Sequence, residues 1–138
     1  ALGGRVVDMG EYELCYQSVE RLGDDPLFDG LPATLTSFET HSDRVAELPP
    51  GATTLARTPY GVQAYRVGRT YGVQFHPEYD RQTAEWILDS KNLDEETHAD
   101  AAATVTDDAI AAASEAAGVF NSFLNIVAGH SRRPGRSW

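Results

Sequence analysis

The sequence contains very little cysteine and no long apolar run, and each shortage excludes a class of protein. Cys15 is the only cysteine among 138 residues, which excludes an internal disulfide framework and agrees with a cytoplasmic location. No apolar run approaches the ~20 residues that cross a bilayer, and the first residues lack the pattern of a secretory signal. We therefore expect a cytoplasmic protein that contacts no membrane.

Basic residues are also scarce. Lysine and arginine together number 11 against 21 aspartates and glutamates, for a formal net charge of -10, and Lys91 is the single lysine. Nucleic acids and anionic membranes attract basic patches, so we expect no nucleic-acid partner. An acidic chain depleted in lysine resembles proteins of salt-loving archaea, in which concentrated salt screens surface self-repulsion. A halophilic, haloarchaeal origin is expected, with an ordinary acidic cytosolic protein as the alternative.

The first ninety residues have the pattern of a strand-rich unit that ends in a helix. β-forming residues and turn signals predict strands over residues 5–7, 13–19, 34–40, 52–57, 62–66 and 70–75. The last two flank Gly68 and form a predicted hairpin. Residues 81–90 predict a helix, because Ala84, Ile87 and Leu88 fall on one face. This order indicates a mixed α/β domain whose first unit covers residues 1–90.

The remaining residues differ in composition. Residues 91–105 are acidic and alanine-rich, and we expect a loop, an insertion or a weak helix there. The third segment, residues 106–138, begins with the helix-capping sequence Thr106-Asp107-Asp108 and should form a long helix with a frayed tail. Apolar side chains that recur every three or four residues are expected to form one buried stripe of this helix: Ile110, Ala113, Ala117, Phe120, Leu124 and Val127.

The segment with the clearest chemistry ends the predicted hairpin. Its strand delivers His76, and Pro77 keeps the backbone of His76 out of the helical region. In an extended chain, residues two apart project from the same face, so His76 and Glu78 can point the same way. A histidine whose Nδ1 proton is held by a carboxylate leaves Nε2 free to serve a nucleophile. A solvated histidine at an exposed strand end is the alternative.

The residues around this pair favour the catalytic interpretation. One run of seven residues strongly resembles the motif that supplies the histidine and glutamate of class I glutamine amidotransferases: Gly72-Val73-Gln74-Phe75-His76-Pro77-Glu78. Residues 40–58 resemble the segment before this motif in the GMP-synthase branch, with its His-x-Asp-x-Val and Leu-Pro-x-Gly. Residues 1–6 resemble the stretch just after the family's nucleophile elbow. The similarity covers residues 1–86.

The resemblance implies a fold and a reaction. The fold would be a flavodoxin-like three-layer α/β sandwich with a mixed, largely parallel sheet, its N-terminal part missing from this chain. In the reaction, a cysteine thiolate attacks the side-chain amide of glutamine, ammonia leaves, and a glutamyl thioester is hydrolysed. His76 would act as base and acid, and Glu78 would orient it.

The resemblance also suggests how the substrate is held and where the ammonia goes. Gln17, Ser18, Val19 and His41 are expected to help to hold glutamine. The ammonia would pass to an ATP-dependent synthetase domain or subunit, and no cofactor is expected. A stand-alone γ-glutamyl hydrolase and a non-catalytic, amidotransferase-like regulatory or binding subunit are the alternatives.

The sequence departs from the family at the nucleophile. The family carries its cysteine in a Gly-x-Cys-x-Gly elbow, whereas Cys15 has no glycine beside it and is expected to be a buried, inert residue. Either the elbow lies upstream of Ala1 or the nucleophile was lost. The histidines His41, His98 and His130 match no metal-ligand spacing, so no metal is expected.

Overall fold

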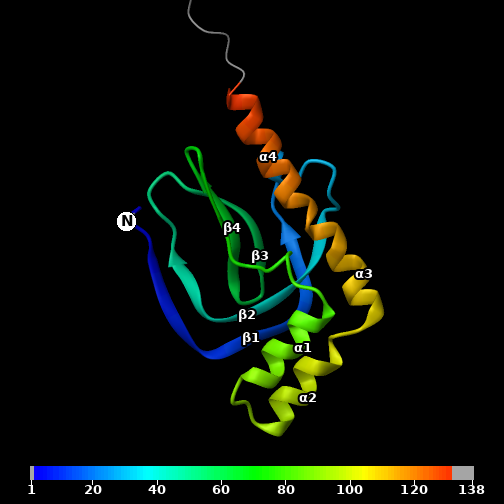
Figure 1. Ribbon diagram of the computed structural model, residues 1–138. Coiled ribbons are helices and arrows are strands. Elements are labelled where there is room, and N and C mark those ends of the chain that lie inside the picture. Colours follow the sequence, from blue (N-terminus) through cyan, green and yellow to red (C-terminus); the bar gives the residue numbers. More distant parts are fainter. Residues whose placement is uncertain (1, 132–138) are drawn as a thin grey trace, which may run out of the picture.

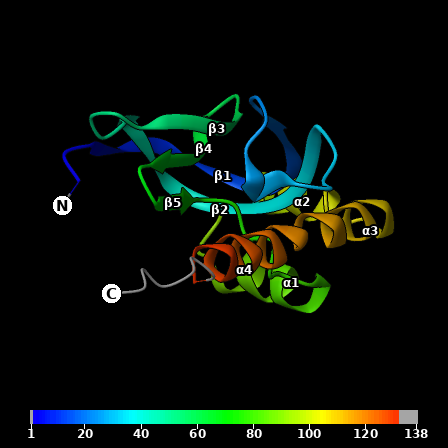
Figure 2. The same cartoon turned by 90° about the horizontal axis from the view of Figure 1, so that it is seen from above.

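A curled sheet with helices on one side makes up the protein. The computed structural model describes residues 2–131. Figure 2 shows the helices gathered below the sheet, and Figure 1 shows the same helices along one side of the strands. The strands are β1 (Arg5–Arg21), β2 (Thr34–Glu47), β3 (Thr53–Thr58), β4 (Gly61–Val67) and β5 (Thr70–Val73). A short 3-10 helix, η1 (Pro26–Phe28), precedes β2, and four helices follow β5: α1 (Arg81–Ser90), α2 (Glu95–Ala103), α3 (Asp107–Ala116) and α4 (Gly118–Ser131).

The five-stranded sheet has the order β2-β1-β3-β4-β5, and every neighbouring pair is antiparallel. The expectation of a largely parallel sheet is therefore wrong for the described residues. Parallel neighbours need long crossover connections, whereas β3, β4 and β5 follow one another through turns and the α-helices come only after β5. The predicted strands over 5–7 and 13–19 are one long strand, β1, with an irregularity between Asp8 and Glu13.

The sheet curls until its two edges meet. Phe38 of β2 forms an isolated antiparallel bridge with His76, which follows β5, and the His76 N–H donates to the Phe38 carbonyl at 3.0 Å. The Gln74 side chain spans the same gap, because its Nε2 donates to the Asp43 carbonyl at 2.7 Å. The segment with the His-Pro-Glu triplet therefore lies along the seam that closes the curl.

Side chains of β1 and β2 alternate between two different environments. Leu14, Tyr16 and Phe38 face the helices and pack against side chains of α1 to α3. Phe38 is fully buried, which contributes roughly 1.5–3 kcal/mol of hydrophobic stabilisation. The residues in between, such as Glu13 and Glu39, point into the interior of the curl, where they are also fully buried.

Local signals account well for the first two helices. Helix α1 has the predicted bounds, and the Asp80 side chain caps it by accepting from the Thr83 N–H at 2.8 Å. Helix α2 occupies much of the segment for which a loop, an insertion or a weak helix was expected, so the helix alternative is the one observed. Asp94 caps α2, and the negative charges of two glutamates in its first turn interact favourably with the helix dipole.

The long C-terminal helix is divided in two. Thr106 caps α3 as expected, but α3 ends at Ala116 and α4 begins at Gly118. A side chain at Gly118 would meet Leu31 Cδ2 at 2.6 Å, so the missing Cβ permits a close approach there.

The predicted apolar stripe is wrong for the second half of this segment. Phe120, Leu124 and Val127 are 49%, 62% and 48% exposed, while smaller side chains face the protein: Ala113, Ala116, Val119 and Ser122. Small residues allow the helices to pack closely on the sheet and on η1. Of the larger side chains of α4, Ile126 packs against the core, and Phe123 contacts the Tyr71 ring. By length and composition alone, residues 107–129 could also cross a membrane, a test that core helices of soluble proteins pass as well. The expected frayed tail lies mostly outside the described residues.

Candidate active site

His76 and Glu78 form a contact pair at the closing seam. His76 Nδ1 lies 2.8 Å from Glu78 Oε1, and the two side chains are 29% and 47% exposed. A carboxylate accepts hydrogen bonds, so Nδ1 carries the hydrogen and the lone pair of the neutral ring is on Nε2. The expected extended backbone is not observed, because Pro77 and Glu78 lie in a turn closed by a weak bond from the Tyr79 N–H to the His76 carbonyl (3.4 Å). The turn, not strand alternation, brings the pair together.

Besides the hydrogen bond to Glu78, the imidazole of His76 is held by the ring of Tyr79. The two rings stack with centroids 4.3 Å apart and an interplanar angle of 7°. Tyr79 packs in turn against Phe38, at a centroid distance of 6.0 Å, and Phe38 is buried beneath the helices. The orientation of His76 is therefore fixed by a carboxylate, an aromatic ring and a backbone hydrogen bond.

Other residues of the seven-residue motif have structural tasks. Gly72 pairs with Tyr65 of β4, and the Tyr65 ring occupies the space that a side chain at Gly72 would need. The Gln74 side chain ties the seam to Asp43. Phe75 is 3% exposed and belongs to the core. In this chain, the glycine, the amide and the aromatic residue before the histidine therefore each have a packing or hydrogen-bonding role.

A groove opens beside the pair. It has a cavity volume of about 400 Å³ and lies between the end of the sheet and α4. His76, Pro77 and Glu78 line one side, and Phe120 and Phe123 of α4 line the other. A partner group that approaches His76 can therefore enter along an apolar wall.

The residues expected to hold glutamine are divided among different environments. The Gln17 side chain donates a hydrogen bond to Glu13, and His41 also contacts Glu13, so these two lie inside the curl. The Ser18 side chain is exposed, and Val19 is a fully buried core residue. Since the Val19 side chain is enclosed, only backbone atoms of this residue are available to a ligand. A role for these residues in holding glutamine stays a prediction.

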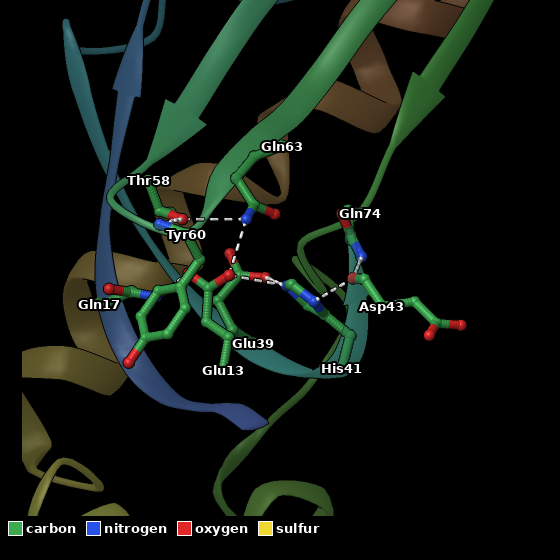
Figure 3. Close-up of polar contacts among 9 residues, drawn as sticks. All are labelled: Glu13, Gln17, Glu39, His41, Asp43, Thr58, Tyr60, Gln63 and Gln74. Atoms are coloured by element: carbon green, nitrogen blue, oxygen red, sulfur yellow. Dashed lines mark hydrogen bonds and ion pairs between the residues drawn. The ribbon is translucent and has the colours of Figure 1, made fainter. Parts of the chain in front are cut away.

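A buried polar cluster lies inside the curl, and it consists of Glu13, Glu39 and His41 (Figure 3). We call it the inner cluster. His41 Nε2 lies 2.9 Å from Glu13 Oε2 and 3.3 Å from Glu39 Oε2, and both carboxylates are fully buried. Burial raises the pKa of Glu39 to about 7, with a further increase from Glu13 that His41 opposes. Burial lowers the pKa of His41, but the two carboxylates outweigh it and raise that pKa to about 9.

Sequence reasoning missed the two glutamates of the inner cluster. The alternation in β1 was a usable signal, because Glu13, Cys15 and Gln17 alternate with the apolar Leu14 and Tyr16. That pattern indicates one polar face, which in an open sheet would be solvated. Closure of the curl buries it instead, and closure depends on pairing between residues far apart in the chain.

Cys15 lies next to the inner cluster and is partly buried. It pairs across the strands with Glu39. Burial and the charges of Glu13 and Glu39 raise the pKa of its thiol to about 11. A nucleophilic cysteine needs the opposite surroundings, an electropositive and accessible site that favours the thiolate. The geometry therefore agrees with the expectation that Cys15 is not the nucleophile.

Comparison with known proteins identifies the family. The model of the class I glutamine amidotransferase family matches residues 1–91, the part of the chain that contains the sheet, the seam and α1. The chain belongs to the class I glutamine amidotransferases. His76 and Glu78 lie within the matched residues.

Among curated proteins, this amidotransferase chain is similar to GMP synthases. It is 41% identical over 80 residues to the glutamine-hydrolysing GMP synthase of Aliivibrio fischeri and 44% identical over 80 residues to that of Thermomicrobium roseum. Each match covers 56% of this chain and 16% or 15% of the relative. The chain thus matches about one-sixth of the length of these relatives.

Solved structures of amidotransferases share the fold. A glutamine amidotransferase from Thermotoga maritima is 25% identical and superposes with a TM-score of 0.65, over 91% of this chain and 55% of that one. One from Methylobacillus flagellatus is 21% identical, with a TM-score of 0.71 over 99% of this chain and 60% of the other. The α/β class predicted from the sequence is confirmed by these neighbours.

Proposed function

We propose that this chain supplies the general base of a glutaminase site that releases ammonia from glutamine. The observation that carries the proposal is the 2.8 Å contact between His76 Nδ1 and Glu78 Oε1, which leaves Nε2 as the proton acceptor. Its place at the end of the family motif, beside an open groove, supports the same role.

The proposed reaction has two halves. Nε2 of His76 takes the proton of a cysteine thiol, and the thiolate forms a bond to the amide carbon of glutamine. The imidazolium then gives this proton to the amide nitrogen, the carbon–nitrogen bond breaks, and ammonia leaves with a glutamyl thioester behind. In the second half, Nε2 takes a proton from water, which attacks the thioester, and the proton returns to the leaving thiolate. Glu78 stabilises the imidazolium in both halves.

The thiol in this scheme comes from outside the chain. Cys15 is the only cysteine in the sequence, and its raised pKa and acidic neighbours make it a poor nucleophile. We propose that a Gly-x-Cys-x-Gly elbow is encoded upstream of Ala1, as in the family resemblance. The DNA sequence of that region tests this directly: a different residue at the cysteine position would favour a non-catalytic, amidotransferase-like subunit.

The ammonia acceptor is proposed from the relatives. Because the similar curated proteins are named as glutamine-hydrolysing GMP synthases, we propose an ATP-dependent synthetase domain or subunit as the partner, in the cytoplasm. Glutamine consumption that is coupled to formation of GMP would support this partner. Hydrolysis of γ-glutamyl compounds without any coupled synthesis would favour a stand-alone hydrolase.

The decisive experiment replaces His76 in the protein expressed together with its upstream region. His76→Ala is expected to lower kcat for ammonia release from glutamine by at least about 10³-fold, because the thiol loses its proton acceptor. His98→Ala is a matched control, since His98 Nε2 also contacts a carboxylate, Asp89, at 3.1 Å, but on the helices α1 and α2. Near-normal ammonia release by His76→Ala would overturn the assignment.

A further inference from the structure

The inner cluster has the composition and arrangement of a metal-ion site. We propose that Glu13, Glu39 and His41 bind one divalent transition-metal ion, with Zn²⁺ and Mn²⁺ as the best candidates. No proton-transfer or bond-breaking step of the proposed glutaminase reaction uses these three side chains, so the metal site would be separate from the His76–Glu78 pair, although His41 is also predicted to help to hold glutamine. The proposal departs from the expectation that His41 is free of metal.

The first argument is convergence. One potential ligand atom from each of the three side chains lies within 4.8 Å of the others, and two of the separations are 2.9 and 3.3 Å. Metal bonds of about 2.0–2.2 Å to nitrogen and oxygen place neighbouring ligand atoms roughly 2.8–3.5 Å apart. The three side chains come from adjacent strands and point at one another (Figure 3). Their spacing is that of ligands around a shared centre.

The second argument is the orientation of His41. Its Nδ1 lies 2.8 Å from the Asp43 carbonyl, which can only accept, so Nδ1 carries a hydrogen. Metal-binding histidines commonly donate their other ring N–H to a carbonyl or carboxylate in this way. Nε2 is buried and makes no hydrogen bond of good geometry, although two carboxylates lie next to it. A divalent cation between Nε2 and the two carboxylates would take the place of the proton that this nitrogen otherwise carries, so binding would release that proton.

The third argument is the state of the buried carboxylates. Glu39 is completely enclosed, and neither of its oxygens accepts a hydrogen bond. Buried carboxylates are costly unless they are paired or coordinate a metal. Glu13, by contrast, is held by the amide groups of Gln17 and Gln63, the latter at 2.8 Å. Glu13 is thus oriented by hydrogen bonds from outside the cluster, and Glu39 keeps its lone pairs free. This combination suits a divalent cation.

The ligand set indicates which ion would bind. Imidazole favours zinc and other transition metals, and carboxylates suit manganese as well, so one imidazole with two carboxylates selects Zn²⁺ or Mn²⁺ over Ca²⁺ or Mg²⁺. The ion would link β1 to β2. It would also fix His41 against the Asp43 carbonyl, which the seam residue Gln74 shares as its acceptor. A stabilising role for the closed curl follows.

Metal binding to the intact chain tests the proposal. After treatment with EDTA, the chain is dialysed against Zn²⁺ or Mn²⁺, and we expect one ion per chain and a higher Tm with at least one of them. Glu39→Gln should weaken binding by at least about 100-fold, since it removes a direct ligand. His98→Ala should bind as wild type does, which separates the inner cluster from a surface histidine–carboxylate pair.

Two further measurements keep the test decisive if a variant folds poorly. In EDTA, Glu39→Gln should have a Tm equal to or higher than that of wild type, because one buried charge is gone. X-ray absorption of the zinc-loaded wild type should show nitrogen and oxygen ligands without sulfur, which excludes Cys15. Failure of both ions to bind the wild-type chain, sulfur in the ligand shell, or unchanged affinity in a folded Glu39→Gln variant would each overturn the proposal.

Discussion

At the scale of single residues, the site depends on which nitrogen of His76 carries a hydrogen. Glu78 accepts from Nδ1, and Tyr79 stacks on the ring, so the tautomer and the orientation are fixed by two neighbours in the same turn. All three residues lie within four positions of the sequence. The proposed acid–base pair is therefore contained in one short motif, while the Phe38 carbonyl of β2 anchors its backbone from a distant part of the chain.

Replacing Glu78 tests this arrangement. In the protein expressed with its upstream region, Glu78→Gln should lower kcat for glutamine hydrolysis by about 10²- to 10⁴-fold, because the wrong histidine tautomer becomes accessible. The half-exposed position of Glu78 predicts little change in Tm. Glu85→Gln, which alters an exposed glutamate of α1, is the control. Activity within a few-fold of wild type for Glu78→Gln would show that the carboxylate does not orient His76.

Gly72 shows how a residue without chemistry supports the same motif. The Tyr65 ring covers this glycine, so Gly72→Ala forces the ring aside and should destabilise the protein by about 1–3 kcal/mol. Urea denaturation measures the change. In the double variant with Tyr65→Ala, the alanine at position 72 should cost much less than in the wild-type background. Equal costs in both backgrounds would exclude the ring as the cause.

At the scale of elements, structure that depends on local sequence patterns could be predicted, whereas structure that depends on long-range pairing could not. Helix α1 could be predicted within its exact bounds, because side-chain periodicity and the Asp80 cap are contained in its own sequence. Whether neighbouring strands pair parallel or antiparallel could not be predicted, since it depends on which segments connect the strands. The inner cluster was missed for a similar reason: it becomes buried only when Phe38 meets His76 across 38 positions of chain.

The cap of α1 gives a pH-dependent prediction. A hydrogen bond from the Thr83 N–H lowers the pKa of Asp80 below its usual value of 3.8. A carboxyl group with a lowered folded-state pKa stabilises the fold above its unfolded pKa, and this contribution is lost as the pH falls through the folded pKa. Asp80→Ala should therefore lower Tm at neutral pH, with a difference from wild type that shrinks in acid.

Asp80→Asn is the matched control for this cap. Asparagine accepts the same hydrogen bond without a titrating group, so its Tm relative to Asp80→Ala should not vary with acid pH. A constant difference between wild type and Asp80→Ala down to pH 2 would contradict a cap that depends on the ionised carboxylate.

At the scale of the whole molecule, the excess of acidic residues sets the response to salt. The formal net charge is -10, so repulsion among negative charges outweighs attraction on balance. Exposed ion pairs such as Arg57–Glu20 would weaken in salt, but each contributes only about 0–1 kcal/mol. Because the screening length falls from about 10 Å at 0.1 M to about 3 Å at 1 M, relief of the repulsion should dominate.

We therefore expect Tm to rise as potassium chloride is increased from about 0.1 M into the molar range, where screening of exposed charges is nearly complete. Calorimetry or circular dichroism can follow the transition. A double variant of two exposed residues, Asp100→Asn and Glu115→Gln, changes the formal net charge from -10 to -8 and should gain less from the same salt, because there is less repulsion to screen. A Tm that falls steadily toward molar salt would mean that ion pairs outweigh repulsion, and the halophilic interpretation would then be wrong.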